Sequence, residues 1–190
     1  MPQTLPEWHA AALRLFGERV RAVEASQWGA ATPCTEWTVR DLVNHVTGEQ
    51  LWVPPLLTEG RTVAEVGDEL SGDLLGEDPP GAWARAAAAG HAAFAAPGAL
   101  ERTVQLSYGP TRGSAYCSEL TADCVVHAWD LSRAIGADDR LPADLVEFSI
   151  KEVMPYADGL AASGMYAEPL EVPAGADAQT RLLALLGRKG

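Results

Sequence analysis

The stretch SELTADCVVHAWDLSRAIG, residues 118–136, decides how this chain folds. As a helix it is apolar over most of its circumference, and its polar stripe covers an arc of roughly 80°. That stripe consists of Glu119, Asp123, His127 and Asp130. A surface helix would have the opposite proportion of apolar residues, so we expect this helix to be buried. Buried carboxylates need a cation, a proton or several hydrogen-bond donors.

The stretch TEWTVRDLVNHVTGEQLW, residues 35–52, predicts a second helix with a matching polar stripe. Asp41, His45, Glu49 and Trp52 share one face of it. The two stripes could face each other across a bundle core, which is where helical bundles commonly build metal sites.

Three local signals define where the helices begin and end. They are the helical spacing of apolar residues, a capping-box-like start at Thr38 with Asp41, and a stop signal at Gly136. The expected helices are Pro6–Ser26, Thr38–Trp52, Gly81–Ala96, Ser114–Ile135, Pro142–Ser163 and Asp177–Leu186, with a helical turn over Val63–Leu70 and an extended segment over Arg102–Gly109.

This pattern predicts an all-α protein, a four-helix bundle with short additional helices. The link over residues 57–80 is long enough to cross one end of the bundle, which favours an up-down-down-up order. A chain of 190 residues is expected to form one domain, residues 1–190.

Charge and composition restrict the partners. A net charge of −12 argues against nucleic acid and against anionic membrane surfaces, and favours a small-molecule partner. No signal peptide or membrane span is expected, and three cysteines without a CxxC motif do not suggest a disulfide framework. We therefore expect a cytoplasmic protein; the oligomeric state stays open, with a homodimer among the alternatives.

Three side chains are the candidate ligands of one divalent metal ion: His45, Asp123 and His127. An Asp/His pair at i and i+4 on one helix, with a histidine on another, supplies three ligands and leaves coordination positions open. Glu49 and Asp130 are expected to orient ligands or to move a proton. Each feature alone has an ordinary interpretation: a packed or solvated histidine, a local salt bridge, a solvent-exposed face.

The other histidines and the cysteines are expected to be largely structural. His9 and His91 have no carboxylate four residues away on the same helix, and Cys117 and Cys124 are interpreted as small packing residues. Cys34 precedes a helix N-terminus, where a thiol pKa can fall, so it is the rival candidate for a chemical role.

Two segments, TPCTEWTVRDLVNHVTGE (32–49) and VVHAWDLSRAIG (125–136), resemble the two signatures of the DinB-like, mycothiol-dependent maleylpyruvate isomerase superfamily. The ending TRLLALLGRKG (180–190) resembles that of its short, single-domain actinobacterial branch. The resemblance implies a four-helix bundle with a divalent metal, most often zinc, bound here by His45, Asp123 and His127. It also implies mycothiol, or a similar thiol, as cosubstrate. The isomerase has Glu where this chain has Asp123, and it carries a further C-terminal domain that is not expected here.

The predicted function is that of a metal- and thiol-dependent transferase or isomerase acting on a small electrophilic substrate. Two alternatives remain open: a non-catalytic metal- or ligand-binding bundle, with Glu49 or another group closing the site, and a metal-dependent hydrolase that uses bound water. Residues 58–80 and 102–113 are expected to line the pocket.

Overall fold

Four long helices form the body of the computed structural model, which describes residues 3–156, 159 and 167–190. They are α1 (Leu5–Ala22), α2 (Val39–Val53), α4 (Pro79–Ala95) and α5 (Gly113–Ile135). Shorter elements are the π-helical turn η1 (Pro54–Thr58), α3 (Val63–Val66), the 3₁₀ turns η2 (Gly67–Leu70) and η3 (Met154–Tyr156), the strands β1 (Thr103–Leu106) and β2 (Gly109–Arg112), and the helices α6 (Ala143–Val153) and α8 (Ala178–Leu185).

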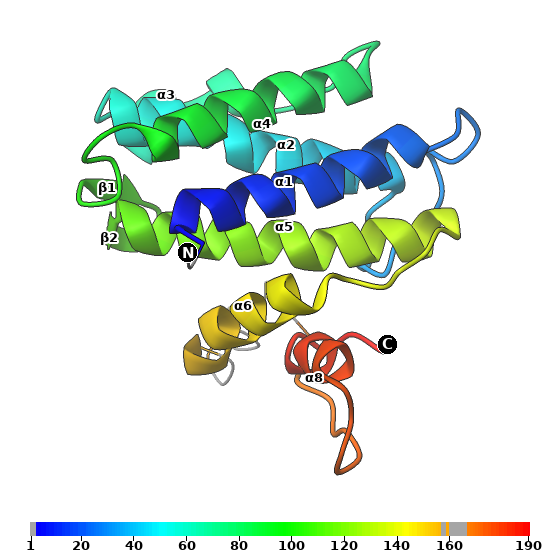
Figure 1. The fold of residues 1–190 in the computed structure, drawn as a ribbon. Coiled ribbons are helices and arrows are strands. Elements are labelled where there is room, and N and C mark those ends of the chain that lie inside the picture. Colours follow the sequence, from blue (N-terminus) through cyan, green and yellow to red (C-terminus); the bar gives the residue numbers. More distant parts are fainter. Residues whose placement is uncertain (1–2, 157–158, 160–166) are drawn as a thin grey trace.

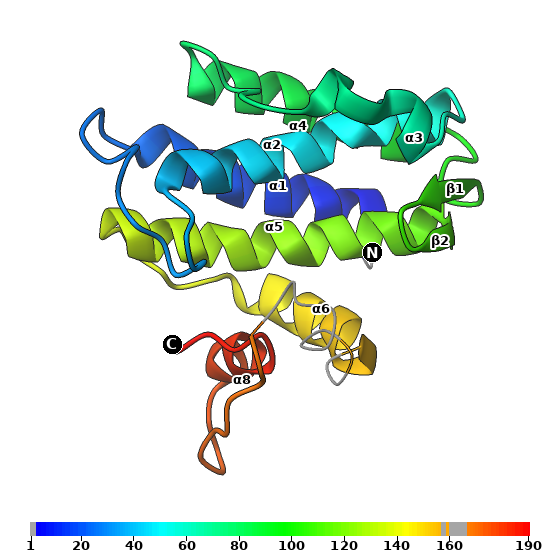
Figure 2. The same cartoon turned by 180° about the vertical axis from the view of Figure 1, so that it is seen from behind.

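The four helices have the expected up-down-down-up order. Helices α1 and α5 run from left to right in Figure 1, whereas α2 and α4 run from right to left; Figure 2 shows the same order from behind. Helix α1 packs against α4 and α5, and α2 packs against the same two helices. The long link between α2 and α4 contains α3 and η2, the expected helical turn. It does not cross one end of the bundle as expected: because α2 and α4 run in the same direction, it runs along the bundle from the end of α2 to the opposite end, where α4 begins (Figure 2).

Local signals in the sequence set both ends of the site-bearing helices. Helix α2 begins with a reciprocal capping box: the Asp41 amide donates to Thr38 Oγ1 (3.3 Å) and the Thr38 amide donates to Asp41 Oδ2 (2.9 Å). Helix α5 ends at Gly136, whose φ of 68° is the left-handed conformation that favours glycine.

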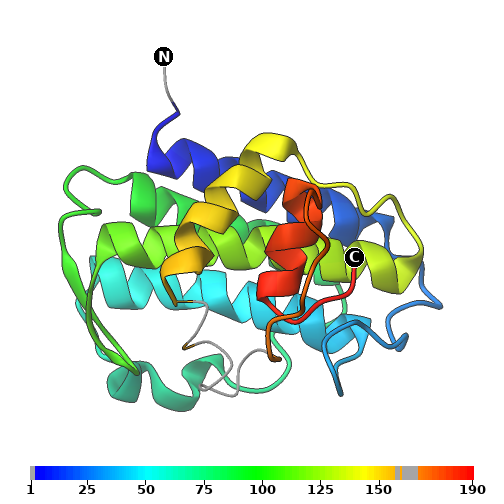
Figure 3. The same cartoon turned by 90° about the horizontal axis from the view of Figure 1, so that it is seen from below.

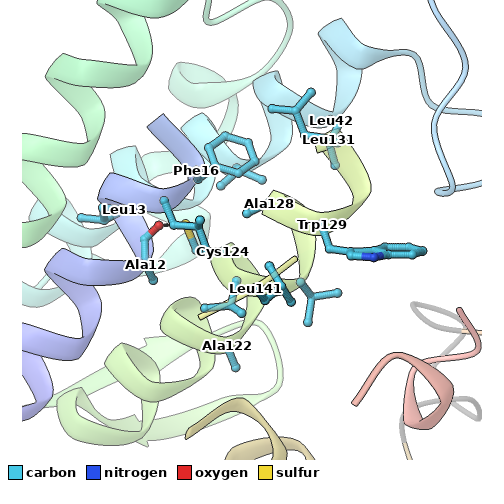
Figure 4. Packing of buried hydrophobic residues seen from close by; sticks show 14 of the residues in the cluster. Ala12, Leu13, Phe16, Leu42, Ala122, Cys124, Ala128, Trp129, Leu131 and Leu141 are labelled. Atoms are coloured by element: carbon cyan, nitrogen blue, oxygen red, sulfur yellow. Dashed lines mark hydrogen bonds between the residues drawn. The ribbon is translucent and has the colours of Figure 1, made fainter. Parts of the chain in front are cut away.

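The core is centred on α5, as its apolar circumference predicted. Figure 4 shows Phe16 and Ala12 of α1 against Cys124 and Ala128 of α5. All four side chains are fully buried, and the Cys124 thiol donates to the Ala12 carbonyl at 3.4 Å. Cys117 is also fully buried, and all three cysteines are free thiols, so the interpretation of Cys117 and Cys124 as packing residues agrees with the structure.

Two helix ends differ from the sequence prediction by more than two residues, and one strand was not predicted. Helix α1 ends at Ala22 rather than Ser26 because Val23 is extended and its amide bonds to the Val20 carbonyl. The expected extended segment is β1, and it pairs with β2 in an antiparallel hairpin that was not predicted. Helix α6 ends at Val153 and continues as η3 to Tyr156, while the rest of the expected helix falls largely outside the described residues.

Helices α6 and α8 cover the outer side of α5. Figure 3 shows both across α5, and α6 packs against α5 and α8. The segment after α8 then returns toward the middle of α5, which brings the end of the described chain beside the polar stripe. Among the described residues, no helix combines the length and apolarity that a membrane span requires.

Candidate metal centre

The structure brings His45, Asp123 and His127 together. One nitrogen of each histidine and one Asp123 oxygen lie within 4.8 Å of one another. The Asp123 oxygens are 3.3 Å from His127 Nε2 and 3.9 Å from His45 Nε2. Ligand atoms around a tetrahedral zinc ion at about 2.1 Å are separated by about 3.4 Å. The three side chains are therefore nearly spaced for one ion, and small rotations would complete the fit.

His127 is held in the tautomer that a metal ligand requires. Its Nδ1 lies 2.9 Å from Asp130 Oδ2, and Asp130 is fully buried. Burial opposes ionisation of Asp130, but the hydrogen bonds from His127 and Arg188 outweigh it and lower the pKa of this carboxyl. An ionised carboxylate only accepts hydrogen bonds, so Nδ1 carries the proton that is donated to it. When His127 is neutral, the lone pair is on Nε2, which faces Asp123.

Arg188, from the segment after α8, fixes Asp130 in turn. Its Nε donates to Asp130 Oδ1 and its Nη2 to Asp130 Oδ2, both at 2.8 Å. This two-point ion pair compensates the buried charge of Asp130 and restricts its rotation. Sequence analysis missed Arg188, because its only signal was a basic residue in the tail segment that carried the family resemblance.

The carboxylates of Asp123 and Asp130 favour a positive charge at His127, between them. Burial opposes protonation of His127, but Asp123 and Asp130 on its two sides outweigh burial and raise its pKa well above the usual value. Burial likewise opposes ionisation of Asp123, yet His127 and His45 lower its pKa. Burial lowers the pKa of His45, which favours the neutral imidazole that binds metals. A divalent ion could replace the proton that His127 otherwise holds on Nε2.

Glu49 lies at the edge of the triad, one helical turn after His45. Its Oε1 is 4.0 Å from His45 Nδ1. Burial, followed by the negative charge of Asp123, raises the pKa of Glu49 to about 7. A carboxyl group with that pKa exchanges a proton readily near neutral pH, as general acid–base catalysis requires.

Cys34 lies on the opposite side of His127 from Asp123. Its thiol is 3.3 Å from Asp130 Oδ2 and 3.8 Å from His127 Nδ1, so a second group of potential ligands is Cys34, His127 and Asp130. In that group the Asp130 oxygens already accept hydrogen bonds from Arg188 and His127. This group is electrostatically satisfied by protein donors, so it fits a metal ion less well than the triad of His45, Asp123 and His127.

The indole ring of Trp37 packs beside both histidines of the triad. The Trp37 ring centroid lies 4.8 Å from that of His45 and 6.1 Å from that of His127. Trp37 immediately precedes the cap of α2, so the same turn that starts the helix also places the indole. The ring packs against the His45 imidazole, whose side chain remains 32% exposed, and limits its rotation.

A pocket of about 90 Å³ lies beside the triad, and Asp123 belongs to both. Its described lining comes from α5, from the end of α6 with η3, and from Leu186. The expected lining segments, residues 58–80 and 102–113, are not among the described lining residues. One residue of the second segment still contacts the pocket lining. The Tyr108 hydroxyl donates a hydrogen bond to Glu119, which lines the pocket.

The remaining histidines lie elsewhere. His9 is fully buried between α2 and α4, and its Nε2 is 3.1 Å from Gln50 Oε1. The His91 ring centroid is 6.0 Å from that of His9. Neither histidine belongs to a group of described residues spaced for a metal ion.

Comparison with known proteins relates both halves of the site to one family. Residues 9–132 match the family model of the mycothiol maleylpyruvate isomerase N-terminal domain. Two relatives from Mycobacterium tuberculosis, the uncharacterized protein MT0763 of strain CDC 1551 / Oshkosh and the uncharacterized protein Rv0738 of strain ATCC 25618 / H37Rv, are each 34% identical over 146 residues, covering 72% of this chain and 70% of the relative.

Solved structures show the same fold at low sequence identity. A crystal structure of the mycothiol-dependent maleylpyruvate isomerase with a histidine-to-alanine mutation superposes with a TM-score of 0.67 and 15% identity, covering 84% of this chain and 70% of that one. The isomerase without this mutation gives a TM-score of 0.63 and 14% identity, with the same coverage.

The family match spans α2 and most of α5, the two helices that carry the triad. The helical bundle of the solved isomerases supports it independently at the level of the fold. This chain therefore belongs to the family of the mycothiol maleylpyruvate isomerase N-terminal domain.

Proposed function

We propose that this protein binds one divalent metal ion, zinc, through His45, Asp123 and His127, and uses a mycothiol-type thiol to act on a small electrophilic substrate as a transferase or isomerase. The observation that carries the proposal is the convergence of these three side chains, with His127 held through its Nδ1 by buried Asp130. The dependence on mycothiol is drawn from the family and from the isomerases that share the fold.

The donor set fits zinc. Two imidazole nitrogens and one carboxylate oxygen are ligands that zinc uses in catalytic sites. Glu49 is not in the group of described residues spaced around one ion, so the triad leaves a coordination position for another molecule. When bound, the metal would lower the pKa of a thiol placed at that position.

The residues of the chain then have separate tasks. Asp130, oriented by Arg188, keeps the Nδ1 proton of His127 and directs Nε2 toward the ion. Glu49, with a pKa of about 7, accepts the thiol proton and can return it after the reaction. Trp37 packs against the His45 ring and limits its rotation.

The thiolate can react with an electrophilic substrate in two ways. A thiolate that adds to an activated double bond removes the double bond, allows rotation, and restores the bond when it leaves, which is cis–trans isomerisation. A thiolate that displaces a leaving group forms a stable carbon–sulfur bond, which is transfer. Both outcomes need the same proton movement at Glu49. Neither the comparisons nor the described residues support a homodimer as a requirement for this site.

Metal content of the purified protein tests the first half of the proposal. We expect about one equivalent of zinc per chain by elemental analysis, and loss of most of it in the double variant His45→Ala, His127→Ala. His91→Ala is the matched control, because it removes a histidine outside the triad. Unchanged metal content in the double variant would disprove the triad.

Thiol dependence tests the second half. The zinc-loaded protein is mixed with mycothiol and a panel of small electrophiles, and consumption of the electrophile is followed with and without the thiol. We expect a thiol-dependent rate that falls at least tenfold in Glu49→Gln. A metal-loaded protein that shows no thiol dependence would support the binding-bundle alternative, and water-dependent consumption without thiol would support the hydrolase.

A further inference from the structure

The pocket beside the triad is apolar inside, although three of its eight described lining residues are acidic. Its walls are Ala122 and Val126 of α5, Val153 of α6, and Leu186 from the segment after α8. These four side chains are buried, and nearly all of the surface that faces the pocket is carbon. A group that enters the pocket therefore meets hydrocarbon rather than charge.

Two of the acidic lining residues have carboxylates that bond to other parts of the protein. Glu119 accepts a hydrogen bond from the Tyr108 hydroxyl. Glu152 accepts one from the Ser118 hydroxyl. Because these donors hold the oxygens, the lining surface is mostly carbon in spite of the two glutamates.

Asp123 joins the pocket to the triad. Its oxygens lie 3.3 Å from His127 Nε2 and 3.9 Å from His45 Nε2, so they are directed at the other two candidate ligands. The same residue also lines the pocket. A molecule bound to the metal would therefore have this apolar space beside it.

The size of the pocket limits what it can hold. Its volume is about 90 Å³. An apolar cavity of about 150 Å³ takes up benzene, so we expect a group of about three or four carbons to fill this one. Each methylene that leaves water for such a surface raises affinity about fourfold. A hydroxyl or carboxylate would lose hydrogen bonds to water and gain little in return, because the surface offers so few polar atoms.

We infer that the substrate of this protein carries an apolar group of about three or four carbons beside its reactive carbon, and that this pocket binds the group. The inference rests on the proposed function, because it requires that the reaction takes place at the metal. It narrows the substrate to an electrophile with a short hydrocarbon group, and it makes Val153 a residue that sets the length of that group.

The test uses the full chain loaded with Co²⁺ and a series of straight-chain thiols from ethanethiol to hexanethiol. A thiolate bound to Co²⁺ gives a charge-transfer absorption band, which reports binding without turnover. The sulfur holds one end of each probe at the metal, so the alkyl chain samples the space beside it.

We expect the affinity to rise about fourfold for each added methylene up to propanethiol or butanethiol, and then to stop rising. The thiol with a hydroxyl in place of the last methyl of butanethiol should bind about tenfold more weakly than butanethiol itself.

Two substitutions at one position should move the end of this rise in opposite directions. Val153→Phe fills part of the pocket and should end the rise about one or two carbons earlier, whereas Val153→Ala enlarges the pocket and should extend the rise by about one carbon. Met154→Ala is the matched control, because the Met154 side chain is 60% exposed and lies outside the described lining. Its profile should match that of the wild type. Val153→Ala decides the test if Val153→Phe does not fold.

The outcomes separate this inference from the proposed function. An affinity that does not depend on chain length, or a rise that ends at the same carbon in the wild type and in Val153→Ala, would overturn the inference alone. A rise that continues equally to hexanethiol in every variant would do the same. Failure of Co²⁺ to bind, or binding of Co²⁺ without any thiol band, would overturn the proposed function and the inference with it.

Discussion

Arg188 and Asp130 form a two-point ion pair that joins the end of the described chain to the centre of the bundle. Arg188 Nε and Nη2 each lie 2.8 Å from an oxygen of Asp130, although 58 residues separate them in the sequence. Asp130 in turn bonds His127. The position of a candidate metal ligand on α5 therefore depends on a residue that follows α8.

Replacement of Arg188 should affect both stability and metal affinity. Arg188→Gln leaves the buried charge of Asp130 without its main partner, so we expect the free energy of unfolding to fall by about 3 kcal/mol. Metal affinity should fall by about tenfold or more, because Asp130 no longer holds His127 firmly. Denaturant titration and metal competition with a chelator measure the two effects.

Two further variants test the origin of these effects. Arg181→Gln, at an exposed position of α8, should change neither quantity. Adding Asp130→Asn to Arg188→Gln should recover part of the lost stability, since the uncompensated charge is removed. A double variant that is as unstable as the sum of both single variants would show that the pair does not act as a unit.

Substitutions at Asp123 and Cys34 distinguish the two possible ligand groups around His127. We expect Asp123→Asn to lower metal affinity by more than tenfold, because the amide has lost the negative charge. Cys34→Ser should retain the metal, since Cys34 lies on the Nδ1 side that is engaged with Asp130. Elemental analysis of both variants decides the question, and loss of metal in Cys34→Ser would move the site to the group of Cys34, His127 and Asp130.

Fluorescence of Trp37 should report metal binding. Its ring lies 4.8 Å from the His45 ring, between centroids, so a paramagnetic ion in the triad would quench its emission. Titration of metal-free protein with Co²⁺ should lower part of the total tryptophan fluorescence. Trp37→Phe should remove most of that change, whereas Trp8→Phe should not, because Trp8 packs against Phe148 on α6 instead. Equal quenching in both variants would contradict the location of the site.

Stability should fall in acid because of His9. Burial, and then the charge of His91, lowers the pKa of His9 to about 4, against 6.5 for a solvated histidine. Between these two values the unfolded chain binds a proton that the folded protein does not, so stability is complete above pH 6.5 and decreases toward pH 4. The full effect is about 3 kcal/mol.

His9→Gln is the variant that isolates this effect. Glutamine can still bond to Gln50 but does not titrate. Denaturant unfolding at a series of pH values from 7 to 4 should show a shallower loss of stability in the variant than in the wild type. Parallel pH profiles would mean that other groups cause the acid sensitivity.

Much of the fold was readable from local patterns. Thr38 and Asp41 mark the start of α2 because a capping box involves only neighbouring residues. Gly136 marks the end of α5 because the left-handed conformation favours glycine.

Other features were predicted wrongly. Helix α1 ends earlier than predicted because the helical spacing of apolar residues continues past Ala22, whereas the backbone at Val23 is extended and ends the helix. Strand β2 was missed because the predicted extended segment stopped at Gly109, and residues 110–112 are identified as a strand only by their pairing with β1.

For the site, the sequence by itself determined which side chains share a helical face, because the helical repeat places Asp123 and His127 one turn apart. Only the tertiary structure decided that His45 faces them, that Cys34 lies behind His127, and that Arg188 holds Asp130. Such contacts join segments far apart in the chain, and their geometry depends on how α2, α5 and the residues after α8 pack together. No local spacing encodes that packing, because the free energy that selects it comes from the whole core.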